Sequence, residues 1–151
     1  MTFDLIDEIL ELSPGKRVAA QSWIAEDAPY FKDHFPGFPV VPGVLLTEMM
    51  GQCAAKSLDV DMDSRGKAML AKIESATFRD WVCPRQLLEL EAEIKLNRPQ
   101  FAKASCRAKV NGKLISDAEL LFTFVPLDKF SLEYRDRALE AFFTLNSKKR
   151  D

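Results

Sequence analysis

The stretch VLLTEMMGQCAAKSL, residues 44–58, decides the fold class of this chain. It contains no proline, and apolar residues occupy nearly every face of the helix that it predicts. A helix that is hydrophobic all round is normally buried, so it needs cover on most sides. An antiparallel sheet curved around the helix would supply that cover.

The segments after this helix alternate apolar and polar residues, as strands with one solvated face do. LELEAEIKL (88–96) and AKASCRAKV (102–110) alternate most clearly, and Asn111-Gly112 then predicts a type I′ hairpin turn before a return strand over 113–125. Strands are also predicted over 16–25 and 68–79, whereas residues 1–13 fit either a helix or a strand and 59–67 a polar loop. The order predicts an α+β fold, with an antiparallel sheet wrapped around a central buried helix.

The pattern near the C-terminus predicts a further helix. In residues 130–145, Phe, Leu and Tyr recur every three to four positions, which is typical of an amphipathic helix. We therefore expect a main domain over 1–128 and a C-terminal helical extension over 129–151.

Composition limits the function classes. A chain of 151 residues suggests one domain, and a net charge of −2 implies no bulk attraction to nucleic acid. Cys53, Cys83 and Cys106 form no CxxC pair and predict buried, reduced thiols, and a single histidine argues against a zinc site, so no metal is expected. The acidic N-terminus does not resemble a signal peptide, and no apolar run has membrane-spanning length. We expect a cytoplasmic protein that does not bind membranes.

One segment, HFPGFPVVPGVLLTEMMGQ (34–52), carries the candidate chemistry. Its prolines at 36, 39 and 42 predict a stiff, extended connector that holds His34 at a set position relative to the helix. Imidazole can accept a proton near neutral pH, although a lone histidine is more often structural. A PxxP ligand for a partner domain is the alternative, but the flanks are apolar and contain no basic residue.

The helix itself offers two further features. Gly43 stands at its start without a Ser, Thr or Asp cap, so the first amides could meet an acceptor and favour negative charge. Glu48 and Gln52 are one turn apart, so Gln52 could orient the Glu48 carboxyl. A carboxyl buried without a partner would favour its protonated form and could act as an acid. The alternatives are a tolerated glycine N-cap and a Glu48 that pairs with an arginine or reaches solvent.

At these residues the chain resembles the (3R)-hydroxyacyl-[acyl-carrier-protein] dehydratases of fatty acid synthesis, whose signature is HFPGxPxxPGVLxxExxxQ. The opening FDLIDEILELSPGKR, the stretch IESATFRDWVCPRQLLELEAEI and the ending VNGKLISDAELLF are also similar to that family, so the resemblance covers about residues 3–125. It implies a hot-dog fold that pairs into a dimeric double hot dog. The chain departs from the family at Pro84-Arg85, where a glycine is absent, at Met69, near the place of a gating tyrosine in some relatives, and in its C-terminal helix.

The resemblance implies removal of water from a 3-hydroxyacyl thioester to give a trans-2-enoyl thioester, without a cofactor. His34 would take the C2 proton, and Glu48 would protonate the departing hydroxyl. The amides of Gly43 and Val44 would bind the thioester carbonyl, and Gln52 would support Glu48. Since the family takes the histidine and the glutamate of one site from two subunits, the chain would form a homodimer, with a hexamer of three such dimers as the larger assembly.

The substrate arm would be phosphopantetheine on an acidic acyl carrier protein. Basic residues that could contact this partner are Lys32, Arg79, Arg85 and Arg98, unless they belong to an ordinary solvated surface. Two other readings stay open: another hot-dog activity, as a thioesterase or an enoyl hydratase, and a non-catalytic module that binds acyl chains or the carrier protein.

Overall fold

The computed structural model describes residues 3–150, and the side chains of residues 3–147. The strands are β1 (Glu8–Ser13), β2 (Arg17–Trp23), β3 (Lys67–Phe78), β4 (Leu87–Asn97), β5 (Phe101–Val110) and β6 (Lys113–Val125). The helices are α1 (Gly43–Leu58), α2 (Met62–Arg65) and α3 (Arg137–Arg150), and short 3-10 turns form η1 (Pro29–Lys32), η2 (Asp59–Asp61) and η3 (Leu127–Lys129).

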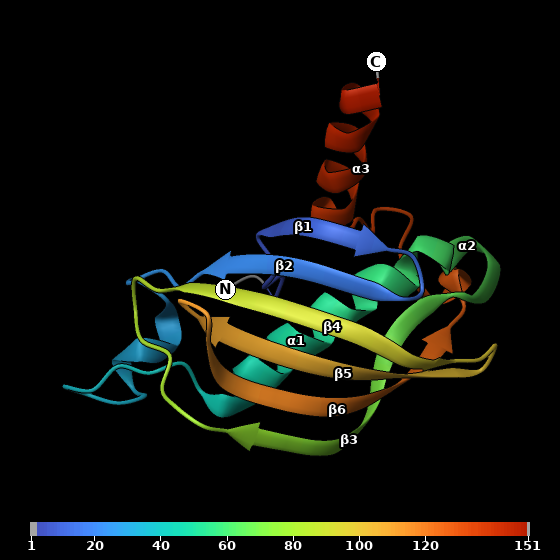
Figure 1. The fold of residues 1–151 in the computed structure, drawn as a ribbon. Helices are drawn as coiled ribbons and strands as arrows, with labels where there is room; N and C mark the ends of the chain where they lie inside the picture. The colour runs from blue at the N-terminus through green and yellow to red at the C-terminus, as the bar shows by residue number, and fades with distance from the viewer. Residues whose placement is uncertain (1–2, 151) are drawn as a thin grey trace.

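The six strands form one antiparallel sheet in the order β1-β2-β4-β5-β6-β3. The sheet curves around α1, which lies across its inner face (Figure 1). Alternate residues of β5 are buried against the helix, as its sequence pattern predicts. The predicted α+β layout of a sheet wrapped around a central helix is confirmed.

The core joins the helix to the inner face of the sheet. Its largest fully buried side chains include Met50, Cys53 and Leu58 from α1, and Leu88, Leu90, Leu120 and Phe122 from the strands. Burial raises the pKa of the Cys53 thiol to about 12, so this thiol is inert at neutral pH. Cys106 is also buried, whereas Cys83 is only half-buried, so the prediction of three buried thiols was wrong for Cys83.

Turn chemistry agrees with the sequence in one place and departs from it in another. Asn111 (φ 52°) and Gly112 (φ 78°) both have positive φ, as a type I′ turn requires. Arg85 also has a positive φ, of 64°, and its backbone N–H donates to the carbonyl of Ile24. The turn before β4 therefore forms with an arginine in the conformation that usually favours glycine.

The C-terminal helix begins later than predicted. Residues 130–136 are not helical, and α3 starts at Arg137. Asp136 explains the start, because its carboxylate accepts a hydrogen bond from the Leu139 N–H and caps the first turn. The base of α3 packs beside β1, and the rest of the helix extends away from the sheet (Figure 1). Within residues 3–150, no helix is long and apolar enough to cross a membrane.

Candidate active site

The segment before α1 folds into a turn that positions His34. The N–H of Phe38 donates to the Phe35 carbonyl at 2.9 Å, and the φ of 80° at Gly37 makes this a type II turn with Pro36 at its second position. The Val40 N–H then donates to the His34 carbonyl at 3.0 Å. The prediction of a continuously extended connector was therefore wrong, because Pro36-Gly37 reverses the chain.

The His34 ring is held by a backbone carbonyl and by the ring of the next residue. Nδ1 lies 3.1 Å from the carbonyl oxygen of Val40, and the ring stacks on Phe35 at a centroid distance of 4.1 Å. Because a carbonyl oxygen only accepts, Nδ1 is the donor, and in the neutral ring Nε2 keeps the lone pair. The turn thus presents His34 as a base with a defined tautomer.

The start of α1 has no side-chain cap, as predicted. Pro42 is the N-cap residue, and its carbonyl accepts from the N–H groups of Leu45 and Leu46. Within the described residues, no acceptor is bonded to the amides of Gly43 and Val44. Since the helix dipole is positive here, these amides can bind an oxygen that carries negative charge.

Close packing explains the glycine at position 43. A Cβ there would lie 3.1 Å from the Phe78 ring, at the end of β3. Gly43 therefore lets the phenyl ring approach the first amides of the helix.

Glu48 lies one turn further along α1 and is oriented by Gln52. The Gln52 amide donates to Glu48 Oε1 at 3.0 Å, as its spacing predicts. The same amide group donates to the Phe3 carbonyl and accepts from the Leu5 N–H at 2.9 Å. Gln52 thus ties the Glu48 carboxyl to the N-terminal segment.

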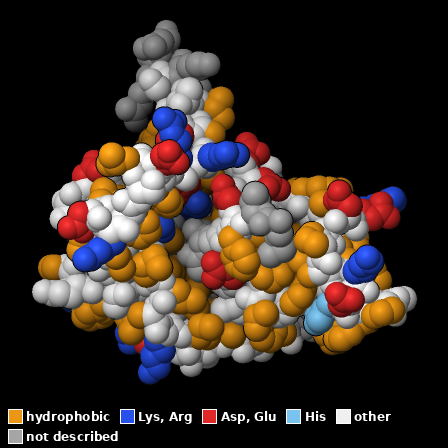
Figure 2. Space-filling view, turned by 180° about the vertical axis from the view of Figure 1, so that it is seen from behind, with side chains coloured by type: hydrophobic (Ala, Val, Ile, Leu, Met, Phe, Trp, Pro, Cys, Tyr) orange, Lys and Arg blue, Asp and Glu red, His pale blue; other side chains and the backbone are white. Residues whose placement is uncertain are grey.

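Glu48 is half-buried in the single chain, so its carboxyl is less enclosed than the apolar sequence around it indicates. It lines a groove of about 1000 Å³ between α1, the N-terminal segment, the start of β3 and the C-terminal segment. Figure 2 shows a hollowed face with apolar side chains around it and the one histidine toward the edge. His34 does not line the groove that contains Glu48.

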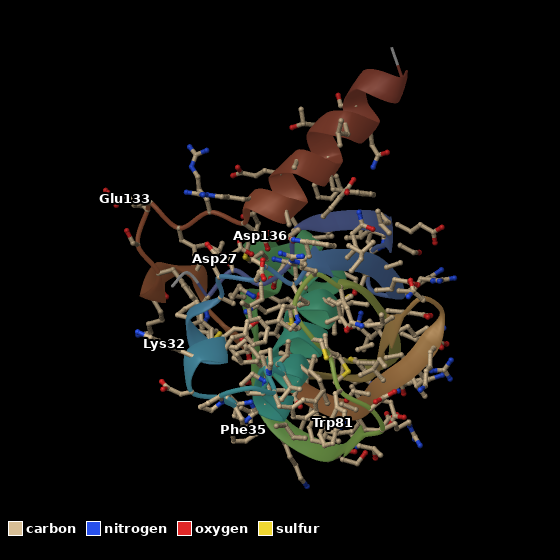
Figure 3. All side chains as sticks on the ribbon, turned by 90° about the vertical axis from the view of Figure 1, so that its left-hand side faces the viewer. Asp27, Lys32, Phe35, Trp81, Glu133 and Asp136 are labelled. Atoms are coloured by element: carbon tan, nitrogen blue, oxygen red, sulfur yellow. The ribbon has the colours of Figure 1, made fainter. Side chains whose placement is uncertain are left out.

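The four basic residues predicted to meet a carrier protein do not gather at one place. Lys32 points away from the body of the molecule, near His34 in sequence (Figure 3). Arg79 bonds to Asp117 and Arg85 to Glu26, so both have acidic partners. Arg98 follows β4, whose end lies beside Gly15 and thus near the C-terminal end of α1. It is therefore remote from the helix start within one chain.

The sequence interpretation missed a second polar cluster at the other end of the groove. Lys56 forms a salt bridge with Asp136, and Lys67 forms one with Asp59. Burial raises the pKa of the Asp59 carboxyl, although Lys67 and the Ala68 N–H oppose that shift. Lysine at position 56, in a largely apolar helix, was the signal that could have indicated a buried partner.

Comparisons with solved structures agree with the architecture. The chain is similar to a component of "The Dehydratase Heterocomplex ApeI:P from Xenorhabdus doucetiae", at a TM-score of 0.66 and 13% identity, over 95% of this chain and 91% of that chain. It is also similar to a hypothetical thioesterase protein with coenzyme A from Streptococcus pneumoniae, at a TM-score of 0.61 and 10% identity, over 79% and 85% of the two chains. At this identity the likeness supports the fold alone.

Sequence comparison decides the family. The FabA-like domain matches residues 1–119. The chain is 39% identical to the 3-hydroxyacyl-[acyl-carrier-protein] dehydratase FabZ of Ruminiclostridium cellulolyticum, over 80% of this chain and 85% of the relative. It is 40% identical to the FabZ of Desulforamulus reducens, over the same shares. The chain therefore belongs to the FabA-like family, among the 3-hydroxyacyl-[acyl-carrier-protein] dehydratases, and its fold is the hot dog expected from the resemblance.

Proposed function

We propose that this protein removes water from a (3R)-3-hydroxyacyl thioester of acyl carrier protein, giving the trans-2-enoyl thioester in fatty acid biosynthesis. One observation carries the proposal: the bond from Nδ1 to Val40 leaves Nε2 of His34 as the proton acceptor, within the family's complete motif. The curated relatives carry the name of this activity.

In the proposed reaction, Nε2 of His34 takes the proton from C2 of the substrate. The C2–C3 double bond forms as the C3–O bond breaks, and Glu48 gives its proton to the departing hydroxyl, which leaves as water. The N–H groups of Gly43 and Val44 donate hydrogen bonds to the thioester oxygen as negative charge develops on it. Removing one such donor typically costs about 3 kcal/mol. The step is redox-neutral, and afterwards one proton has moved from His34 to Glu48 to restore the enzyme.

The substrate site is completed by a second copy of the chain. β3 is a twelve-residue strand at the edge of the sheet, and Met69, Ile73 and Phe78 on it are between 44% and 49% exposed. A long edge strand with exposed apolar side chains invites pairing with another strand. We therefore assign β3 to a homodimer interface, across which His34 of one protomer meets Glu48 of its partner; three dimers would make the larger assembly.

Complementation between two variants tests both the chemistry and the shared site. His34→Asn keeps an N–H donor for the Val40 carbonyl but cannot act as a base, and Glu48→Gln keeps an acceptor for Gln52 but loses the acid. Each should reduce turnover of a 3-hydroxyacyl carrier substrate by about 10²–10⁴-fold without changing the oligomeric state. Full activity in either variant would overturn the mechanism.

Mixing the two variants then tests where the residues act. If subunits exchange, a mixed dimer contains one site with both wild-type residues, so activity should return in part. A mixture that exchanges subunits but stays inactive would place both residues in one chain. Release of free thiol from the acyl substrate by the wild type would favour a thioesterase instead, and tight carrier binding without turnover would favour a binding module.

Lys32 is the basic residue best placed for the carrier protein, because it lies two positions before His34 and has an exposed side chain. Lys32→Glu should raise KM for the carrier-bound substrate and leave KM for the same acyl chain on free pantetheine unchanged. Arg98→Glu is the matched control at the other end of the sheet.

We place the reaction in the cytoplasm, where the carrier-bound intermediates of the pathway would be found.

A further inference from the structure

The groove beside Glu48 follows α1 in one direction only. Glu48, Gln52, Ala55 and Lys56 all line it, and their spacing places them on one stripe of the helix. The rise of an α-helix makes the path from Glu48 to Lys56 about 12 Å long. An apolar chain that starts beside Glu48 and follows this stripe therefore reaches Lys56 after about two helical turns.

The C-terminal segment closes the groove at Lys56. Nζ of Lys56 lies 2.9 Å from both carboxylate oxygens of Asp136, and the two side chains are only 9% and 6% exposed. Tyr134 and Ala138 line the groove next to this pair. Figure 3 shows Asp136 at the base of α3, well away from Phe35 and Trp81.

This wall is built by a part of the chain that the family match does not include. The matched domain ends at residue 119, and β6 ends at Val125. The groove residues of the C-terminal segment lie between 134 and 141. The C-terminal part of the end wall therefore lies outside the matched family domain.

We propose that the C-terminal segment limits the length of the acyl chain that the enzyme accepts, with Tyr134 and the Lys56–Asp136 pair as the end of the acyl site. This inference rests on the proposed function. An extended chain advances about 1.2 Å per bond, as a polypeptide does, so roughly ten bonds fit between Glu48 and Lys56. A longer apolar tail would have to displace a buried ion pair, and leaving either charge unpaired is costly.

The test is a comparison of kcat/KM for 3-hydroxybutyryl, 3-hydroxydodecanoyl and 3-hydroxyhexadecanoyl carrier substrates. The wild type should accept the first two and discriminate against the third. Tyr134→Ala removes part of the wall and should raise the ratio of hexadecanoyl to butyryl kcat/KM on the order of tenfold. Lys56→Met combined with Asp136→Asn removes both charges while Asn keeps the helix cap, and it should raise the same ratio.

The matched control is Phe143→Ala, on the α3 helix that follows Tyr134 and Asp136. Phe143 is 45% exposed and does not line the groove, so the ratio should stay at the wild-type value. A wild type that turns over hexadecanoyl as well as dodecanoyl substrates would overturn the inference. So would an unchanged ratio in both groove variants when their unfolding curves show that they are folded.

Calorimetric binding of saturated acyl-pantetheines of the same lengths to the Glu48→Gln variant separates this inference from the proposed function. A length limit in binding, without turnover of any substrate by the wild type, would support the acyl site and refute the dehydratase. Turnover of all lengths, without a limit in binding, would refute the end wall and leave the dehydratase in place.

Discussion

Lys56 on α1 and Asp136 before α3 are 80 positions apart in the chain, yet their side chains form a nearly buried salt bridge with N–O distances of 2.9 Å. Asp136 also caps α3 through the Leu139 N–H. One carboxylate therefore joins the C-terminal segment to the central helix and starts the helix that follows. The salt bridge to Lys56 fixes where the C-terminal segment lies against α1. The hydrogen bond from the Leu139 N–H to Asp136 sets where α3 begins.

Removing one member of this pair should destabilise the fold strongly. Asp136→Ala leaves the Lys56 charge buried and the cap empty, and we expect the free energy of unfolding to fall by about 3–5 kcal/mol. Lys56→Met combined with Asp136→Asn should recover most of this loss, because no buried charge remains and the cap persists. Urea unfolding of the three proteins measures both effects. Equal stabilities for Asp136→Ala and the wild type would show that the pair does not hold the segment.

Gln52→Ala should loosen the N-terminal segment and Glu48 together. The substitution removes the acceptor for the Leu5 N–H and the donor to Glu48, and unsatisfied groups of this kind cost about 1–3 kcal/mol when buried. Hydrogen exchange at the Leu5 amide should accelerate, and kcat should fall while KM changes little. Exchange at Leu5 as slow as in the wild type would contradict this role of Gln52.

Gly43→Ala should disturb the first amides of α1 through Phe78. The added Cβ would lie 3.1 Å from the aromatic ring, so either the ring or the helix start must shift. We expect a lower kcat that is partly restored when Phe78→Ala is added, as a double-mutant cycle would show. Strictly additive effects of the two substitutions on kcat would mean that the close contact is not the cause.

Stability at high pH should depend on Tyr134. Burial raises the pKa of Tyr134 from 10.0 to about 12, and the carboxylates of Asp59, Asp136 and Asp4 add to the shift. Between these two values the unfolded chain loses the proton and the native protein keeps it. The contribution of this group is therefore complete below pH 10 and is lost as pH rises through 12.

Tyr134→Phe provides the measurement, because phenylalanine does not titrate. The difference in unfolding free energy between the wild type and the variant should shrink between pH 10 and 12, as followed by urea titration. A difference that stays constant over this range would show that the phenol titrates equally in both states.

Gly66→Ala should be more harmful than Gly37→Ala. Both glycines have positive φ, of 99° and 80°, so both substitutions introduce backbone strain of about 1–3 kcal/mol. A Cβ at Gly66 would also lie 2.3 Å from the carbonyl oxygen of Val125, whereas nothing lies within 4 Å at Gly37. Thermal unfolding should show the larger loss for Gly66→Ala, and equal losses would rule out the close contact as a constraint.

Local patterns predicted most of the regular structure. The alternation over 102–110 and 113–125 became β5 and β6, and Asn111-Gly112 formed the expected turn. Spacing also predicted the bond between Gln52 and Glu48. These features depend on side-chain period and turn sterics within a few residues, which a sequence displays directly. The prediction of an extended connector before α1 was wrong because Pro36-Gly37 favours a chain reversal as much as Pro39 and Pro42 favour extension.

The sequence by itself determined the elements, the central apolar helix and the motif from His34 to Gln52, because each is a short-range pattern. Only the tertiary structure decided which stripe of α1 stays open and where the groove beside Glu48 ends. That end depends on the pairing of Lys56 with Asp136, which no local pattern specifies. The pairing arises because a charge placed on a buried helix must find its partner wherever the folded chain brings one.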